Sequence, residues 1–206
     1  MSNIDKERIF LSGSSLVGGN PARGRVDNDF YATQPQSVMS LLEVENFNFN
    51  NNIILEPCVG MGHIIETMKV KYPNLNYVGI DIVDRGYKDT IISDFLNYDF
   101  DYSVGNIISN PPFSLAENFI RKSMSILDDK GKCCMFLKIQ FLEGKARQEF
   151  FKEYPPKTIY VFSKRQTPLR DGKETDENGR KWNSTMCFAW FVWEKGYSGD
   201  TIIKWI

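Results

Sequence analysis

Short apolar runs alternate with segments of helical periodicity along most of this chain. Near-continuous apolar runs are typical of strands that are covered on both faces of a sheet, and apolar residues three or four positions apart indicate helices. This alternation predicts an α/β fold with a largely parallel sheet. We expect strands at 53–55, 77–82, 90–92, 104–109, 133–139, 158–162 and 187–193. We expect helices at 35–42, 62–71, 115–127 and 145–152.

The segment after the first strand combines an acid with two glycines before a helix. It reads Glu56-Pro57-Cys58-Val59-Gly60-Met61-Gly62. Glycines let the backbone turn tightly and approach a ligand, and a helix N-terminus presents free N–H groups. Because ligands of parallel sheets bind at the carboxyl ends of the strands, we expect a ligand site here. The loop lacks the glycine spacing of dinucleotide folds and the Gly-Lys-Ser/Thr of a phosphate loop.

Two further acids stand at the ends of the next strands. Asp81 ends the second strand, where a carboxylate can accept hydrogen bonds from both hydroxyls of a ribose. Asp94 and Phe95 end the third strand. Their side chains could bind the amino group and the face of an adenine. For Asp94 a plain turn cap is the alternative.

Asn110-Pro111-Pro112-Phe113 after the fourth strand is the most specific pattern in the chain. Two prolines stop the strand and fix the backbone. They would hold the Asn110 amide oxygen and the Pro111 carbonyl as a rigid pair of acceptors for both hydrogens of a planar –NH₂ group. Phe113 could then stack on the ring that carries the amine. A bare turn is the alternative.

Length and composition describe a globular domain. The chain has 206 residues, of which 42% are apolar and 25% charged, which are ordinary globular values. No run approaches the ~18 apolar residues of a membrane helix, and the charged N-terminus does not resemble a secretory signal. We expect a cytoplasmic location. The four cysteines form no C-x-x-C pair and His63 is the only histidine, so we expect neither a disulfide framework nor a metal site.

Charge is distributed unevenly along the chain. Residues 1–137 hold 12 Lys/Arg against 17 Asp/Glu, and residues 138–195 hold 12 against 8. A polyanion would therefore prefer the C-terminal part. The glycine- and serine-rich segment 1–27 is interpreted as a flexible arm. The polar stretch 164–184 is either a surface loop or a substrate-contacting loop. Its candidate substrate contacts are Arg165, Arg170, Arg180 and Lys181, with Trp182 available for stacking.

These motifs, in this order, resemble those of class I S-adenosylmethionine-dependent amino-methyltransferases. The overall pattern is similar to small phage-type N6-adenine DNA methyltransferases. Asp29-Phe30-Tyr31-Ala32-Thr33-Gln34-Pro35 resembles the segment that contacts the methionine end of the cofactor in that family. The resemblance covers about residues 27–163, and 188–196 is similar to the family's closing strand.

The resemblance implies a fold, a cofactor and a reaction. The fold would be a three-layer Rossmann-like methyltransferase domain over 28–206, with a mostly parallel central sheet and an antiparallel closing strand. The cofactor would be S-adenosylmethionine, and the reaction would methylate N6 of an adenine extruded from DNA, in a bacterial or phage-infected cell. The implied cofactor contacts are Tyr31, Thr33, Glu56, Pro57, Gly60, Gly62, Asp81, Ile82, Asp94, Phe95 and Asn110. The implied catalytic residues are Asn110, Pro111, Pro112 and Phe113, with Phe113 also binding the substrate base.

Other functions remain open at this point. The Asn-Pro-Pro-aromatic pattern also serves enzymes that methylate RNA, at guanine N2 or adenine N6, and enzymes that methylate protein glutamine at N5. The segment 29–35 favours DNA adenine. A non-catalytic nucleic-acid-binding module with a retained cofactor pocket is a second alternative. A dehydrogenase is disfavoured because the glycine spacing is wrong. No large separate recognition domain fits into the chain, so sequence specificity is left open.

Overall fold

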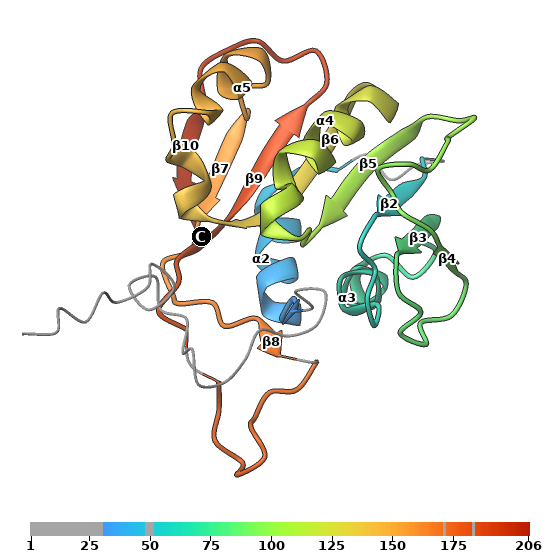
Figure 1. The fold of residues 1–206 in the computed structure, drawn as a ribbon, viewed down its shortest axis with the longest axis vertical. Helices are drawn as coiled ribbons and strands as arrows, with labels where there is room; N and C mark the ends of the chain where they lie inside the picture. The colour runs from blue at the N-terminus through green and yellow to red at the C-terminus, as the bar shows by residue number, and fades with distance from the viewer. Residues whose placement is uncertain (1–30, 48–51, 171, 183) are drawn as a thin grey trace, which may run out of the picture.

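The computed structural model describes residues 31–47, 52–170, 172–182 and 184–206. The expected arm at 1–27, together with Asp29 and Phe30, lies outside the described residues. The described chain is built around an eight-stranded sheet with the strand order β10-β7-β9-β6-β5-β2-β3-β4. Helices cover both faces of this sheet (Figure 1).

The elements alternate as the apolar pattern predicts. The sheet strands are β2 (Ile54–Glu56), β3 (Tyr77–Asp81), β4 (Thr90–Ile92), β5 (Val104–Ser109), β6 (Leu127–Lys138), β7 (Thr158–Val161), β9 (Phe188–Glu194) and β10 (Ile202–Trp205). The helices are α2 (Pro35–Val44), α3 (His63–Lys71), α4 (Ala116–Ile126) and α5 (Arg147–Glu153), with 3₁₀ turns η3 (Phe113–Leu115) and η4 (Ile139–Leu142).

Most neighbouring strands of the sheet run parallel. Strand β9 is the exception, because it lies antiparallel between β6 and β7. The predicted mostly parallel sheet with an antiparallel closing strand is thereby confirmed. The parallel strands β2 to β5 all point their carboxyl ends toward one edge of the sheet, which is where the glycine loop and the strand-end acids lie.

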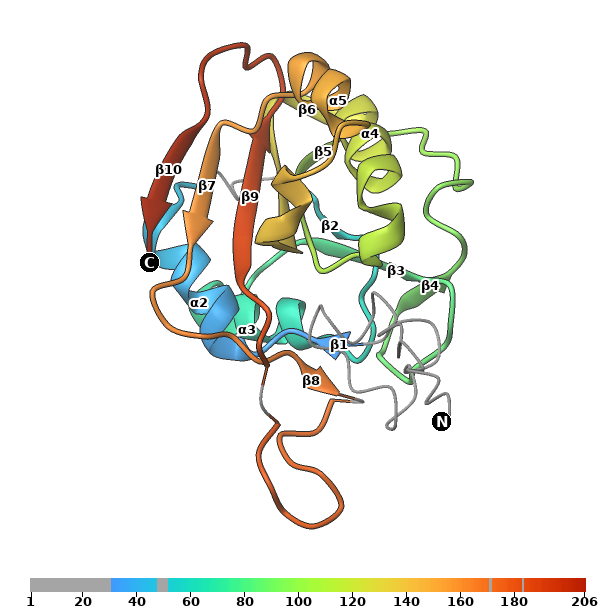
Figure 2. The same cartoon turned by 60° about the vertical axis from the view of Figure 1, so that its left-hand side comes forward.

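Helices lie on both faces of the sheet, as the two views of Figures 1 and 2 show, and an apolar cluster fills the space on each side. Helices α2 and α3 pack on one face, in a cluster that includes Leu41, Ile64 and Ile108. Helices α4 and α5 pack on the other, in a cluster that includes Phe119 and Ile107. Ile107 and Ile108 are adjacent in β5 and both fully buried, because successive side chains of a strand point to opposite faces.

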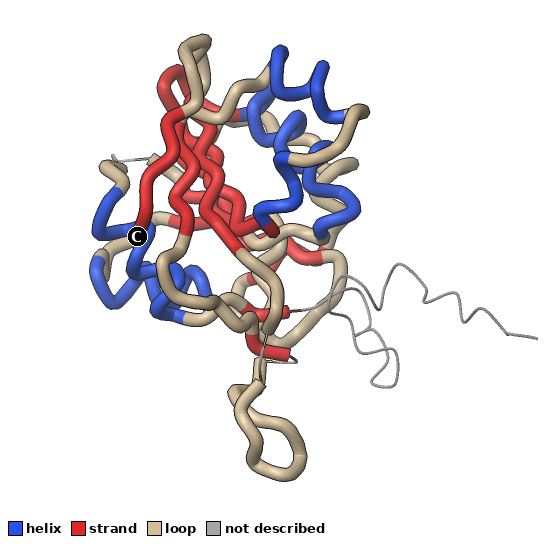
Figure 3. Tube along the Cα trace, turned by 90° about the vertical axis from the view of Figure 1, so that its left-hand side faces the viewer, coloured by secondary structure: helices blue, strands red, loops and turns tan. Residues whose placement is uncertain are grey.

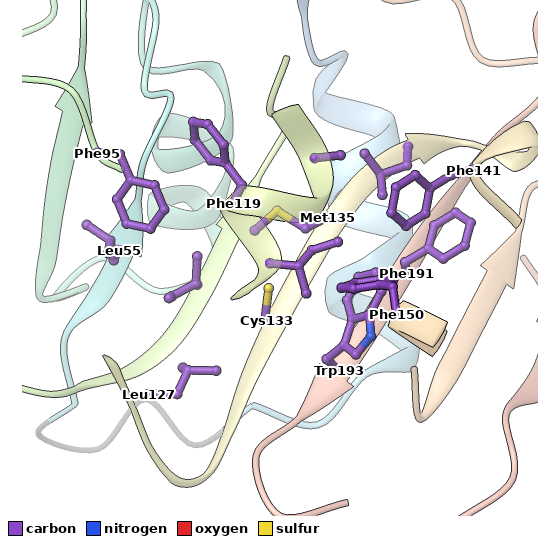
Figure 4. Packing of buried hydrophobic residues seen from close by; sticks show 14 of the residues in the cluster. Leu55, Phe95, Phe119, Leu127, Cys133, Met135, Phe141, Phe150, Phe191 and Trp193 are labelled. Carbon is purple, nitrogen blue, oxygen red and sulfur yellow. The ribbon is translucent and has the colours of Figure 1, made fainter. Parts of the chain in front are cut away.

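The cluster under α4 and α5 is dominated by aromatic rings, which Figure 4 shows from close by. Phe141 lies edge-on to Phe150 and Phe191, at centroid distances of 6.1 and 5.7 Å. Phe191 and Trp193 stack at 5.9 Å. The Trp193 indole donates a hydrogen bond of 2.9 Å to the Tyr154 carbonyl, so its polar atom is satisfied inside the cluster.

Three features differ from the sequence-based expectation. Strand β6 begins at Leu127, not at residue 133, because the segment expected to stop the helix pairs with β5 through a register shift. Strand β10 joins the sheet edge parallel to β7. A two-stranded ribbon, formed by β1 (Tyr31–Ala32) and β8 (Leu169–Arg170), lies outside the main sheet.

The chain from 172 to 182 folds back on itself and projects from the body, as the tube in Figure 3 shows. We call it the projecting hairpin. Thr175 pairs with Lys181, and Asp176 accepts hydrogen bonds from the backbone N–H groups of Asn178 and Arg180 at its tip. This part of the expected loop is therefore ordered by its own turn. No helix within the described ranges is long and apolar enough to cross a bilayer.

Candidate active site

A pocket opens where the parallel strands β2 to β5 end. It collects residues from the ribbon strand β1, the glycine loop, the ends of β3 and β4, and the segment after β5. The lining comprises Tyr31, Ala32, Thr33, Glu56, Pro57, Cys58, Val59, Met61, His63, Ile64, Asp81, Ile82, Arg85, Ser93, Asp94, Phe95, Asn110, Pro112, Leu115 and Phe119.

The glycine loop closes tightly on the end of β3. Gly60 and Gly62 have φ angles of 55° and 80°, in the left-handed region that glycine adopts without strain. The Gly60 N–H donates a 2.8 Å hydrogen bond to Asp81 Oδ2, and the Val83 N–H donates one of 3.0 Å to Asp81 Oδ1. A Cβ at Gly62 would lie 2.2 Å from the Tyr87 ring. The two glycines thus allow the tight conformation of the loop, and neither of them lines the pocket.

Glu56 is a buried acid at the floor of the pocket. It is 2% exposed, and its Oε2 has no hydrogen-bond partner among the described residues. Burial raises the pKa of the Glu56 carboxyl well above its ordinary value, a hydrogen bond from the Ile65 backbone lowers it, and nearby Asp81 raises it further. Thr33 Oγ1, also on the pocket wall, is another buried atom without a described partner. Buried polar atoms of this kind are normally satisfied, so both point to a polar ligand.

Asp94 and Phe95 line the pocket but have structural roles as well. Asp94 accepts hydrogen bonds from the Leu96 N–H at 3.0 Å and from Asn97 Nδ2 at 2.6 Å, so it caps the turn after β4. The Phe95 ring is 2% exposed and packs against Phe119 at 5.0 Å. Its ring belongs mainly to the core, and only part of it can face a ligand.

Asn110 is held at the end of β5 by the ribbon. Its Nδ2 donates a 2.7 Å hydrogen bond to the carbonyl of Tyr31, which fixes the amide plane and directs the oxygen Oδ1 away from Tyr31. The turn is reinforced by the Leu115 N–H, which donates to the Pro112 carbonyl at 2.9 Å. The side chain therefore presents an oriented acceptor next to the pocket.

Phe113 belongs to this turn but does not line the pocket. Its ring packs against Phe188 at a centroid distance of 6.0 Å. The ammonium of Lys138 lies 4.7 Å from the Phe113 ring centroid. Pro111 is buried behind the turn. Asn110 and Pro112 thus line the pocket, whereas the Phe113 ring packs on Phe188 outside its lining.

The basic residues of the stretch 164–184 do not line the pocket. The Arg165 guanidinium donates to the Thr185 carbonyl and the Cys187 sulfur. The guanidinium of Arg170, in the ribbon, lies 5.8 Å from the Trp182 ring centroid. Arg180 and Lys181 belong to the projecting hairpin. All four residues stay predicted substrate contacts, and none of them lines the pocket.

Sequence reasoning missed several lining residues. Arg85 comes from the loop between β3 and β4, and Leu115 and Phe119 come from the turn and helix after β5. Cys58 lies inside the glycine loop, where burial and the charges of Asp81 and Glu56 raise the pKa of its thiol. His63 begins α3, and partial burial lowers the pKa of its imidazole. Of these, Cys58 carried a signal because it lies within the glycine-loop motif, and His63 carried one because it follows that motif directly.

The pocket chemistry fits S-adenosylmethionine. Among the described residues, the lining brings together the acids Glu56, Asp81 and Asp94 and the guanidinium of Arg85, so the pocket favours a ligand with hydrogen-bond donors and cationic groups. The unpartnered oxygen of Glu56 suits an ammonium or sulfonium, and the strand-end Asp81 suits ribose hydroxyls. Among the residues that the structure describes, no group of three or more His, Cys, Asp or Glu side chains is arranged to hold a metal ion.

Comparison with known proteins agrees with this fit. No family model matches the chain. The type II methyltransferase M.CvrRI of Paramecium bursaria Chlorella virus XZ-6E is 25% identical over 119 residues, which cover 54% of this chain and 31% of that protein. The chain therefore spans about a third of the length of this curated relative.

Solved structures show the same fold. A protein of Listeria monocytogenes assigned to class I S-adenosylmethionine-dependent methyltransferases superposes with a TM-score of 0.61 at 15% identity, over 90% of this chain and 68% of that one. The M protein of the type I restriction enzyme EcoKI gives 0.57 at 12% identity, over 82% and 44%. The chain has the class I methyltransferase fold. The resemblance read from the ordered motifs is confirmed at this level, and S-adenosylmethionine is the cofactor that these likenesses imply.

Proposed function

We propose that this protein transfers a methyl group from S-adenosylmethionine to the N6 amine of adenine in DNA. The observation that carries the proposal is the anchored amide of Asn110. Because its Nδ2 is engaged by the Tyr31 carbonyl at 2.7 Å, its Oδ1 is the atom presented to an acceptor. An oriented amide oxygen recognises an N–H donor, and an exocyclic –NH₂ supplies two.

The residues of the turn would activate the amine without a strong base. Asn110 Oδ1 and the Pro111 carbonyl accept one hydrogen bond each from the –NH₂ group. These bonds bias the nitrogen toward tetrahedral geometry and aim its lone pair outward. S-adenosylmethionine, when bound, supplies an electrophilic methyl group. Positioning and polarisation are then the contributions of the protein, and the proton leaves the nitrogen after it has become cationic.

Phe113 would hold the ring that carries the amine. It lies outside the lining of the cofactor pocket, where it contacts Phe188 and Lys138. A base can reach this position only outside the helical stack. The acceptor would therefore be an extruded or single-stranded adenine that stacks on Phe113 while its amine faces Asn110.

The comparisons support DNA as the acceptor. The viral relative is a type II methyltransferase, and two structural neighbours, the EcoKI M protein and the type IIG restriction endonuclease BpuSI, belong to restriction enzymes, which act on DNA. We propose, in addition, that the projecting hairpin contacts the DNA next to the target, since the ribbon ties its base to the pocket wall at Tyr31.

The test is transfer of a labelled methyl group from S-adenosylmethionine to unmethylated DNA, with ribosomal RNA and total protein as parallel acceptors. We expect the label in N6-methyladenine after digestion of the DNA. Asn110→Ala should abolish transfer and leave cofactor affinity, measured by calorimetric titration, within a few-fold. The matched control is Asn74→Ala, an exposed asparagine far from the turn in sequence and outside the pocket lining.

Each other outcome identifies a different function. Label in N2-methylguanine of RNA, or in protein glutamine, would replace DNA adenine by one of the other planar amines. Cofactor binding without transfer to any acceptor would leave a non-catalytic module. Equal loss of transfer and cofactor affinity in Asn110→Ala would remove the assigned role of Asn110.

A further inference from the structure

The sheet ends on one side at a strand whose outer edge has no partner strand in the described part of the chain. Strand β10 pairs with β7 alone, and it lies at the margin of the sheet in Figures 1 and 2. The side chains of Ile202, Ile203 and Trp205 are 50%, 48% and 72% exposed. An exposed edge strand with apolar side chains is a template for pairing with another strand.

The hydrogen bonds of β10 show which of its backbone groups are available. The N–H groups of Ile202 and Ile206 donate to backbone carbonyls in and next to β7, at 3.1 and 2.9 Å. Alternate residues of a strand direct their backbone groups to the same side, so the even-numbered residues bind β7. The backbone groups of Thr201, Ile203 and Trp205 therefore point to the open edge, where they can bind a further strand.

The charges beside this edge are self-complementary. Asp200 and Lys204 stand two residues before and two residues after Ile202, and both are exposed. The Lys204 ammonium lies 5.8 Å from the Tyr160 ring centroid, which leaves its charge uncompensated. In an antiparallel pair of two identical strands centred on Ile202, Asp200 of each copy lies opposite Lys204 of the other. Opposite charges at such cross-strand positions stabilise a sheet.

Other registers of the same pairing are less favourable. A pair centred on Lys204 sets two ammonium groups against each other, which destabilises a sheet. A pair centred on Ile203 sets each Lys204 against an isoleucine and leaves Asp200 without a counter-ion. The register centred on Ile202 pairs both charges, and it joins the open backbone groups of Ile203 to those of Thr201 in both directions. A lysine normally discourages pairing at a sheet edge, but in this register an acid meets it.

We propose that β10 is a homodimer interface, at which two copies of this chain pair their β10 strands antiparallel about a twofold axis through Ile202. The sheets of the two copies then form one continuous sheet. Both copies contribute the same residues, as in most soluble oligomers with twofold symmetry. The inference is independent of the proposed methyl transfer, because no residue of β10 lines the pocket.

The first experiment follows the molar mass of the full chain by sedimentation equilibrium over a series of concentrations. We expect a reversible monomer–dimer equilibrium that weakens at high salt, because the two ion pairs lie at the surface. Lys204→Asp sets acids against each other at two symmetric positions, and it should raise the Kd of the dimer at least about tenfold. Combining it with Asp200→Lys restores opposite charges and should return the Kd to within about threefold of wild type.

The matched control is Lys88→Asp, which makes the same charge change at an exposed lysine of the loop before β4. It should leave the Kd of the dimer unchanged. Thermal unfolding of each variant at a concentration where wild type is monomeric shows whether the fold itself is intact.

A cysteine cross-link tests the register. In the proposed pair the two Ile202 residues are non-hydrogen-bonded neighbours with Cα atoms about 4.5 Å apart, which a disulfide can span. The two Ile203 residues lie diagonally, about 7–8 Å apart, which is too far for a disulfide. Under mild oxidation Ile202→Cys should give a covalent dimer. Ile203→Cys should not, and neither should wild type, whose exposed Cys187 is present in all three proteins.

Two results would overturn the inference. A chain that remains monomeric over the whole concentration series would mean that the open edge is covered by another part of the chain or stays unpaired. A dimer whose Kd is the same in wild type and Lys204→Asp, or one that is cross-linked through Ile203→Cys and not through Ile202→Cys, would place the contact on another surface or in another register.

Discussion

Asp81 joins the glycine loop to the end of β3 through both of its carboxylate oxygens. It accepts the N–H of Gly60 at 2.8 Å and the N–H of Val83 at 3.0 Å, and it lines the pocket. Loop geometry and cofactor affinity should therefore depend on the same carboxylate. Asp81 is only 8% exposed, yet we expect its substitution to change both the conformation of the loop and the affinity for the cofactor.

We expect Asp81→Asn to weaken S-adenosylmethionine binding by roughly ten- to hundredfold, since hydrogen bonds to a charged group contribute about 1.5–3 kcal/mol. Calorimetric titration measures this. The control is Asp89→Asn on the exposed loop after β3, where φ is 60° and asparagine is well tolerated. Equal affinity of the two variants would show that Asp81 does not bind the cofactor.

Glu56 should make stability depend on pH. Its pKa is raised by burial in the folded chain, above the ordinary value of 4.5. At a pH between the ordinary pKa and the raised pKa, the folded state keeps a proton on Glu56 that the unfolded state has released. The free energy of unfolding should therefore fall as pH rises through this window, by about 1.4 kcal/mol per pH unit.

Glu56→Gln should remove this contribution. Urea unfolding at several pH values above 4.5 should show wild type losing stability relative to the variant as pH rises. Glu149→Gln, an exposed glutamate on α5, serves as the control and should keep the wild-type slope. Parallel pH profiles of wild type and Glu56→Gln would mean that Glu56 ionises normally.

At this scale the sequence identified residues that follow strands, because the carboxyl ends of parallel strands meet at one edge. Glu56, Asp81 and Asn110 were found in this way and do line one pocket. Arg85 was not, since an arginine in a loop has no distinguishing pattern. Its position depends on neighbouring strands, which only the folded chain brings together.

Among the elements, the ribbon of β1 and β8 connects the pocket to the projecting hairpin. Tyr31 pairs with Arg170 and Ala32 with Leu169, and Ser37 Oγ donates a 2.6 Å hydrogen bond to Gln166. Beyond the ribbon, a Cβ at Gly172 would lie 2.9 Å from the sulfur of Met61 in the glycine loop. The base of the hairpin and the glycine loop are therefore in direct contact.

Two glycines of the hairpin allow this contact to be tested. Gly172 and Gly179 have φ angles of 70° and 72°. Substitution of either glycine by alanine should therefore introduce about 1–2 kcal/mol of backbone strain. Only Gly172 has the loop beside it, since a Cβ at Gly179 meets nothing within 4 Å. We expect Gly172→Ala to weaken cofactor binding about fivefold, the equivalent of about 1 kcal/mol, and Gly179→Ala to leave it unchanged.

Calorimetric titration of S-adenosylmethionine into both variants decides the matter, with thermal unfolding as a measure of the shared strain. Similar affinities for the two variants would mean that the hairpin and the glycine loop are energetically independent, despite their contact.

The sequence predicted elements with a strong period and missed those without one. The helices and most sheet strands lie within a few residues of their predicted positions, because their apolar faces recur regularly. Strands β1 and β8 have two residues each, which is too short for any period. Strand β10 exposes all four of its residues, so it carries no burial pattern, and it is defined only by its pairing with β7.

For the whole molecule, the two apolar layers are separated by one sheet. Ile107 and Ile108 are fully buried and belong to different clusters. We expect Ile107→Val and Ile108→Val each to lower the free energy of unfolding by about 0.5–1.5 kcal/mol. Because their side chains share no cluster, the double variant should lose the sum within about 0.5 kcal/mol.

Urea unfolding of the two single variants and the double variant measures this additivity. A coupling energy above about 1 kcal/mol would indicate that the layers respond together through the β5 backbone. The three-layer arrangement itself could be predicted from sequence, since strands that are apolar on both faces require a cover on each side.

Strand β9 has a consequence for how the protein is made. It fills a central position of the sheet, between β6 and β7, although it comprises Phe188–Glu194 and thus follows most of the chain. Until residue 194 has left the ribosome, β6 and β7 each lack a neighbour, and two apolar strand edges stay open to other chains. Completion of the sheet must therefore wait for translation of β9, close to the end of the sequence.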